Sequence, residues 1–221
     1  MDKKQVSEQI RSIGIIPVVR AASADEAMLA VDAIYAGGIT TVEITMTVPG
    51  AVEIIRKLSA SRGSEVLVGA GTVLDPESAQ QCIDAGAQFI VSPSLSTATI
   101  EAAAKRGILM MSGALTPTEI VTAWRSGSDF VKVFPCGQVG GVAYIRALRG
   151  PLPQIPLVPT GGVNLNTAAD FIAAGCVALG VGGELVQVAA LKARKPEIIT
   201  AAARQFVEIV QRARGCVLAA K

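Results

Sequence analysis

The chain of 221 residues contains no histidine. Histidine is the commonest general base near neutral pH and the commonest metal ligand in proteins. Its absence excludes a Ser-His-Asp or Cys-His catalytic site. A metal site in this chain would have to consist of carboxylates, which suit magnesium or calcium better than zinc or iron.

Paired cysteines and a targeting segment are lacking as well. The four cysteines (Cys82, Cys136, Cys176 and Cys216) lie far apart and form no C-x-x-C pair, so neither a zinc site nor a redox motif is indicated. The N-terminal stretch "MDKKQVSEQIRSIG" lacks the apolar core of a signal peptide and is typical of a short amphipathic helix. We therefore expect a cytoplasmic protein with reduced thiols.

Charge and long apolar runs are also limited. The net charge is only +2 and the charges are dispersed, so no basic stripe suggests a nucleic-acid partner. No uncharged run approaches the ~20 apolar residues of a membrane span. Hydrophobic residues still make up 51% of the chain, but aromatics only 4%. A sizeable core can therefore be built, mainly from Ala, Val, Ile and Leu.

Short apolar runs alternate along the chain with segments of helical pattern. The runs are rich in β-branched residues and are followed by Gly, Pro or Ser, as is typical of buried parallel strands. They span residues 14–21, 40–46, 65–71, 88–93, 107–113, 129–135, 155–162 and 177–183. Helices are predicted between them, with clear cap residues in 23–38, 75–87, 116–127 and 164–175.

About eight strand–helix units in one chain of this length predict a (β/α)8 TIM barrel with a short N-terminal helix. A doubly wound open sheet is the alternative, but its Gly-x-Gly-x-x-Gly fingerprint is absent after the first strand. No linker or low-complexity stretch interrupts residues 1–221. We therefore expect a single barrel domain.

The run "DFVKVFP" (129–135) contains one lysine, Lys132. Side chains alternate along a strand, so if Val131 and Val133 face the helices, Lys132 points into the barrel together with Phe134. The same alternation turns Glu43 inward from the strand at 40–46. A structural ion pair is one interpretation, although buried pairs stabilise poorly.

A functional interpretation follows from the same burial. An apolar wall disfavours the ammonium form of Lys132, and a free amine attacks a carbonyl to form a Schiff base. Glu43 would then transfer protons as acid and base. Arg20 and Thr72, at the ends of the first and third strands, fit the carboxylate of a keto acid. Arg20 could instead form an ion pair with an acidic side chain at the surface, and Thr72 could cap a helix.

Glycine-rich turns follow the last two strands, in "PTGGVN" (159–164) and "GVGGEL" (180–185). Main-chain N–H groups at such turns can bind an anion, and this is the usual phosphate site of barrel enzymes. A tight turn is the structural alternative. We predict a phosphorylated 2-keto acid as the small-molecule partner. The substrate-binding residues predicted from these patterns are Arg20, Thr72, Phe134, Thr160, Gly161, Gly162, Gly182 and Gly183.

Five segments, in this order, resemble the 2-keto-3-deoxy-6-phosphogluconate aldolase family, the class I aldolases of the Entner–Doudoroff pathway. They are "VEIT", "VGAGTVLDP", "GAQFIVSPSL", "VKVFP" and "VPTGGVN", within a resemblance from about Ile13 to Val186. The resemblance implies a metal-independent lyase, without a cofactor, that releases pyruvate and glyceraldehyde 3-phosphate. Members are often described as also cleaving 4-hydroxy-2-oxoglutarate, and they are commonly trimers.

The resemblance also implies roles for individual residues. Lys132 matches the Schiff-base lysine of the family and Glu43 its acid and base. Thr72 matches a residue that holds the pyruvate carboxylate, and Pro93 lies in a site motif of the fourth strand.

Two positions depart from the family pattern. Thr47 stands where many members carry an arginine. The galactonate-epimer branch also lacks that arginine and has one at the end of the first strand, so we expect Arg20 to bind the carboxylate, across the barrel from Gly162 and Gly183. Glu184 replaces a serine at the phosphate loop. It would stabilise the following helix as a first-turn acid or, pointed inward, repel phosphate. The galactonate-epimer branch also has an acid at this position, so we still expect phosphate binding.

Two other functions are compatible with a barrel of this kind. A magnesium-dependent keto-acid lyase needs at least two acids at strand ends, and only Glu43 is found there. A non-catalytic barrel that binds a phosphorylated metabolite would tolerate the loss of Lys132.

Overall fold

The computed structural model describes residues 1–219. Within them, eight parallel strands form one sheet in the order β7-β6-β5-β4-β3-β2-β1-β8. The strands are β1 (Ile15–Val19), β2 (Thr41–Thr45), β3 (Leu67–Gly71), β4 (Phe89–Val91), β5 (Leu109–Ala114), β6 (Phe130–Val133), β7 (Leu157–Pro159) and β8 (Leu179–Val181).

The sheet closes on itself between β7 and β8. The Val177 N–H group donates a hydrogen bond to the Leu157 carbonyl oxygen at 3.1 Å, and Thr160 and Gly180 form a parallel bridge. All neighbouring strands run parallel, as they must when a helix follows each strand. The predicted (β/α)8 TIM barrel is confirmed.

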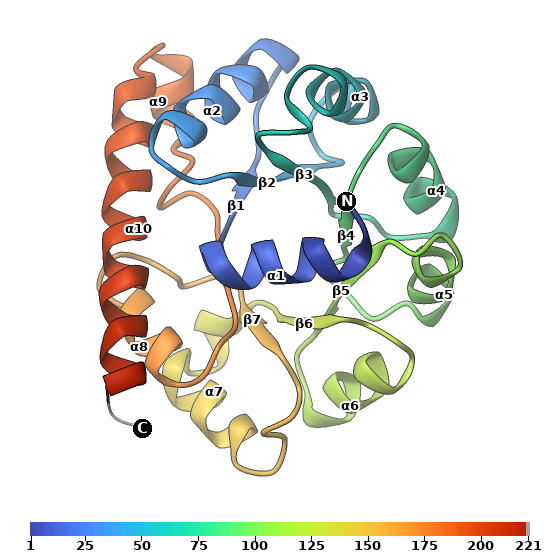
Figure 1. Cartoon of the computed structure of the whole chain (residues 1–221), viewed down its shortest axis with the longest axis vertical. Helices are drawn as coiled ribbons and strands as arrows, with labels where there is room; N and C mark the ends of the chain where they lie inside the picture. The colour runs from blue at the N-terminus through green and yellow to red at the C-terminus, as the bar shows by residue number, and fades with distance from the viewer. Residues whose placement is uncertain (220–221) are drawn as a thin grey trace.

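Helices surround the ring of strands, except for the first helix, which lies across one end of it (Figure 1). They are α1 (Lys3–Ile13), α2 (Ala24–Ala36), α3 (Ala51–Arg62), α4 (Pro76–Asp84), α5 (Thr97–Lys105), α6 (Pro117–Arg125), α7 (Val142–Arg149), α8 (Ala168–Ala173), α9 (Val188–Lys192) and α10 (Pro196–Ala219), with a short 3-10 helix η1 (Cys136–Val139) after β6. In residues 1–219 no helix combines the length and the apolar character that crossing a bilayer requires.

Some predicted boundaries were too wide. The strand predicted at 155–162 ends at Pro159, because Gly161 and Gly162 adopt left-handed φ angles of 82° and 80° and turn the chain away from the sheet. The helix predicted at 164–175 begins only at Ala168. Before it, the Asn164 side-chain oxygen accepts a hydrogen bond from the Thr167 N–H group at 3.1 Å and forms a turn.

Two apolar clusters follow from the alternation of side chains. One fills the barrel interior and contains Phe89 and Phe130, both fully buried. The other lies between strands and helices and contains Val42, Val131 and Val133. The predicted orientation of the outward-facing valines is therefore confirmed, and the intervening residues of the same strands point inward.

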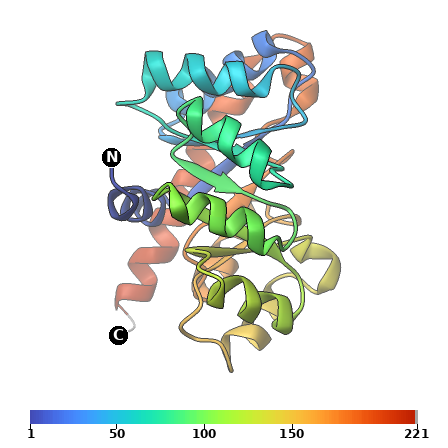
Figure 2. The ribbon, with the colours of Figure 1, turned by 90° about the vertical axis from the view of Figure 1, so that its right-hand side faces the viewer.

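Helix α1 closes one end of the barrel. In Figure 1 it lies across the ring of strands, and Figure 2 shows it outside the strands at one end of the barrel. Val6 and Ile10, its two buried residues, join the interior cluster. The Lys3 ammonium pairs with the Asp129 carboxylate at 2.9 Å. The predicted amphipathic N-terminal helix thus packs on the amino ends of the strands.

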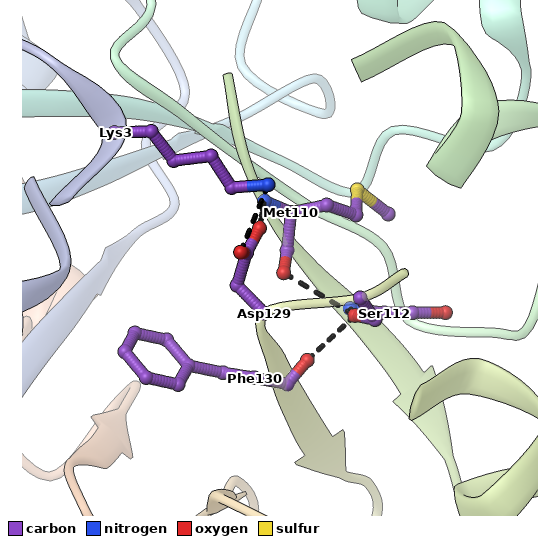
Figure 3. A network of polar contacts seen from close by, with 6 residues as sticks. Lys3, Met110, Ser112, Asp129 and Phe130 are labelled. Carbon is purple, nitrogen blue, oxygen red and sulfur yellow. Dashed lines mark hydrogen bonds and ion pairs between the residues drawn. The ribbon is translucent and has the colours of Figure 1, made fainter. Parts of the chain in front are cut away.

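A polar network holds the amino end of β6 beside β5 (Figure 3). Asp129 also accepts a hydrogen bond from the Met110 N–H group at 2.9 Å. The buried Ser128 hydroxyl accepts one from the Ser112 N–H group at 2.9 Å and lies 2.6 Å from the Phe130 carbonyl oxygen. The start of the strand that carries Lys132 is therefore fixed by contacts from both α1 and β5.

Gly69 gives a direct test of packing in the interior. A Cβ atom at this position would overlap the ring of Phe89 on the neighbouring strand. Because a filled core tolerates little extra volume, we expect Gly69→Ala to lower the free energy of unfolding by about 1–3 kcal/mol. Urea unfolding measures the change.

Gly215→Ala is the matched control, since Gly215 is exposed in α10 and a Cβ atom there meets no atom within 4 Å. That substitution should leave stability unchanged or raise it by up to about 1 kcal/mol through helix propensity. Equal effects of the two substitutions would contradict the packing argument.

Candidate active site

Lys132 lies inside the barrel, near the carboxyl end of β6. Its side chain is only 5% exposed, and its neighbours Val131 and Val133 pack in the outer layer as the sequence predicted. The carboxyl ends of the strands are where barrel enzymes place their chemistry. The lysine is therefore positioned by the strand itself rather than by a mobile loop.

Glu43 on β2 faces Lys132 across the interior. The Lys132 Nζ atom lies 3.7 Å from Glu43 Oε1, and the glutamate side chain is 2% exposed. Among the described residues, Glu43 Oε1 has no hydrogen-bond partner. A buried carboxylate oxygen without a partner is costly to maintain. It is free to exchange a proton with a molecule bound next to the lysine.

Gly71 provides the room for this carboxylate. A Cβ atom at position 71 would overlap Glu43 Oε1. Gly71 pairs with Thr45, two residues beyond Glu43 on the adjacent strand, so the missing side chain lies where the glutamate extends. No role for this glycine was predicted from the sequence. The signal in the sequence is a small residue at the end of one strand when the preceding strand carries an inward-facing acid.

Phe134 contacts the lysine and connects it to a cavity. The Lys132 Nζ atom lies 5.4 Å from the centre of the Phe134 ring, within the range of a cation–π interaction. The same phenylalanine lines a cavity of about 270 Å³. Phe134 therefore forms the wall between the lysine and the space beside it.

The cavity lies at the ends of β1, β6, β7 and β8 and contains both glycine-rich turns. Its polar and glycine lining consists of Arg20, Thr160, Gly161, Gly162, Gly180, Gly182, Gly183 and Glu184. A Cβ atom at Gly180 would overlap the Thr160 hydroxyl, so Gly180 leaves room for that side chain. The structure thus brings together the glycine loops that the sequence assigned to one site.

Arg20 lies on the same side of the barrel as these loops. We expected it across the barrel from Gly162 and Gly183, but all three residues line one cavity. The reason is topological. β1, which ends just before Arg20, pairs with β8 through Ile15–Leu179, Ile16–Gly180 and Pro17–Val181. Closure of the ring therefore puts Arg20 beside the turn that follows β8.

Thr72 and Pro93 belong to the opposite part of the rim, after β3 and β4. Thr72 has a left-handed φ of 57°, which is uncommon for a β-branched residue and costs roughly 1–3 kcal/mol. Pro93 crosses the end of β5, because a Cβ atom at Gly113 would overlap the Pro93 carbonyl carbon. Neither residue lines the cavity that contains Arg20.

The cysteines offer no reactive thiolate near the site. Cys136 follows Phe134 closely and is fully buried, and burial raises the pKa of its thiol to about 11. Burial likewise raises the pKa of Cys82 to about 11 and that of Cys176 to about 12. In residues 1–219, no three His, Cys, Asp or Glu side chains gather closely enough to hold a metal ion.

Comparison with known proteins defines the class. A family model described as KDPG and KHG aldolase matches residues 6–202. KHG/KDPG aldolase of Escherichia coli K12 is 34% identical over 206 residues, which are 93% of this chain and 96% of that protein. The 2-dehydro-3-deoxy-6-phosphogalactonate aldolase of the same organism is 33% identical over 198 residues, covering 89% of this chain and 96% of that protein.

A solved structure agrees with these relatives. KDPG aldolase from Legionella pneumophila, with pyruvate captured as a covalent carbinolamine intermediate, superposes with a TM-score of 0.83 at 28% identity, covering 90% of this chain and 97% of that one. The fold and the relatives identify a carbon–carbon lyase of the aldolase type. The chain belongs to the KDPG and KHG aldolase family.

The interaction between Lys132 and Glu43 can be tested by measuring the free energy of unfolding. Lys132→Met leaves the Glu43 carboxylate without the opposite charge 3.7 Å away, and breaking a buried pair in this way typically costs about 3–5 kcal/mol. Adding Glu43→Gln should restore part of the loss, because the second substitution removes the uncompensated charge.

Urea unfolding of the wild type, both single variants and the double variant gives the coupling energy. Purely additive effects of the two substitutions would mean that the two side chains do not interact in the folded protein.

Proposed function

We propose that this chain is a class I aldolase that forms a Schiff base through Lys132. Its substrate is 2-keto-3-deoxy-6-phosphogluconate or the galactonate epimer, cleaved to pyruvate and glyceraldehyde 3-phosphate. Cleavage of 4-hydroxy-2-oxoglutarate to pyruvate and glyoxylate belongs to the same proposal. The observation that carries it is the burial of the Lys132 amine 3.7 Å from the Glu43 carboxylate. The names of the two E. coli relatives support the choice of substrates.

Lys132 is the nucleophile in this proposal. Its amine attacks the C2 carbonyl of the keto acid, and loss of water leaves a protonated Schiff base. The positively charged nitrogen accepts the electron pair of the C3–C4 bond, so that this bond breaks and the aldehyde departs. Pyruvate remains on Lys132 as an enamine. Protonation at C3 and hydrolysis then release pyruvate and restore the amine.

Glu43 transfers the protons. Its carboxylate accepts the proton of the C4 hydroxyl while the C3–C4 bond breaks, and the same carboxyl group returns a proton to C3 of the enamine. The free Oε1 atom and the space left by Gly71 support this role. Because both side chains extend from strands, little movement is needed between the two proton transfers.

The two ends of the substrate lie on different sides of Lys132 in this proposal. The carboxylate end lies toward Thr72 and the main chain around Pro93, on the side of β3 and β4. The distal end occupies the cavity with Arg20 and the main-chain N–H groups of the turns at Gly161–Gly162 and Gly182–Gly183. Assembly as a homotrimer, which the family resemblance implies, belongs to the same proposal.

Trapping with borohydride tests the nucleophile. Incubation with pyruvate and borohydride should add one reduced pyruvate to the wild type, and a tryptic digest should locate it on Lys132. Lys132→Met, and Lys132→Met combined with Glu43→Gln in case the single variant unfolds, should remove the adduct. Lys105→Met, which removes an exposed lysine of α5, should keep it. An adduct on another lysine, or none in the folded wild type, rejects the Schiff-base mechanism.

Glu43→Gln tests the proton transfer. Glutamine keeps the shape of the side chain but does not exchange the proton, so kcat should fall by about 10²–10⁴-fold. Formation of the pyruvate adduct should change much less, since Lys132 is intact. Steady-state cleavage and trapping are measured on the same preparation. A loss of kcat below about threefold would reassign Glu43 to a structural role.

A further inference from the structure

The distal cavity contains one cation and one anion. Arg20 and Glu184 are both exposed side chains, and both line the cavity of about 270 Å³ together with the glycine turns. The remaining polar lining consists of the Thr160 hydroxyl and main-chain groups. The cavity that would bind the distal end of the substrate is therefore not uniformly positive.

Glu184 has no evident structural task. The helix after it, α9, begins only at Val188 and has no acidic residue in its first turn, so the expected role as a first-turn acid was wrong. Elsewhere in the barrel, Glu26 and Glu119 accept hydrogen bonds from main-chain N–H groups ahead of α2 and α6. Within residues 1–219, no ion pair or hydrogen bond of the Glu184 side chain is found. Its carboxylate is available to a ligand.

The chemistry of a carboxylate limits which ligand it can contact. An ionised carboxylate only accepts hydrogen bonds. A doubly charged phosphate also only accepts them, so the two groups cannot bond and they repel each other. A hydroxyl group donates one hydrogen bond and accepts others. It can therefore donate to Glu184 while it accepts from Arg20 or from the N–H groups of the glycine turns.

We propose that Glu184 is a specificity-determining residue that weakens the preference of the distal cavity for a doubly charged phosphate over a hydroxylated chain end. The inference rests on the proposed aldolase function and refines its substrate class. Arg20 and the glycine turns still attract a phosphate. Glu184 reduces the advantage that they give the phosphorylated substrate over the same keto-deoxy sugar acid without phosphate.

The test is the ratio of kcat/KM for the phosphorylated and the unphosphorylated 2-keto-3-deoxy sugar acid. Glu184→Gln removes the charge and keeps an acceptor oxygen. It should raise this ratio about tenfold, mainly through a lower KM for the phosphorylated substrate, since like charges in contact are strongly unfavourable. Arg20→Ala should lower the ratio. Both effects should weaken at high salt, which screens exposed charges.

Glu197→Gln is the matched control. Glu197 is exposed at the start of α10 and does not line this cavity, so its substitution changes the net charge equally but should leave the ratio unchanged. An unchanged or lowered ratio in Glu184→Gln overturns the inference. If the wild type fails to form the pyruvate adduct on Lys132, the proposed function itself is wrong, so the two failures are distinguishable.

Discussion

Two opposite charges inside an apolar barrel are the constraint that the rest of the structure has to accommodate. Moving each ion out of water costs several kcal/mol, and a separation of 3.7 Å between Lys132 and Glu43 is too long for a hydrogen bond to repay this cost fully. The stability comes from the apolar cluster around Phe89 and Phe130 and from the layer between strands and helices. Apolar packing of the barrel fixes the positions of Lys132 and Glu43, and their ion pair is not the source of the stability of the barrel.

At the rim of the barrel, a glycine on one strand leaves room for a polar side chain on the neighbouring strand. Gly71 faces the Glu43 carboxylate, and Gly180 faces the Thr160 hydroxyl. In both cases one strand omits a side chain and its neighbour extends a polar one into the vacant place. Polar groups are thereby directed into the barrel mouth without widening the ring, and their positions depend on strand register rather than on loop conformation.

The sequence predicts those features that depend on local periodicity. The inward orientation of Lys132 and Glu43 follows from the alternation along each strand, whatever the rest of the fold. The predicted position of Arg20 was wrong because alternation within one strand does not say which strand lies beside it, whereas the closed barrel, itself predicted, puts β8 beside β1. Glu184 was assigned to a helix that begins later than its sequence pattern suggests. The space at Gly71 requires the register of β2 against β3, which no single segment encodes.

The closed end of the barrel has a practical consequence for attaching the protein to a surface. Helix α1 covers the amino ends of the strands, and Val6 and Ile10 fill the interior beneath it. Lys132, Glu43 and the glycine turns all lie toward the other end. Met1 is 65% exposed on the α1 side. A tether joined to the N-terminus would therefore orient every immobilised molecule with its barrel mouth facing the solution.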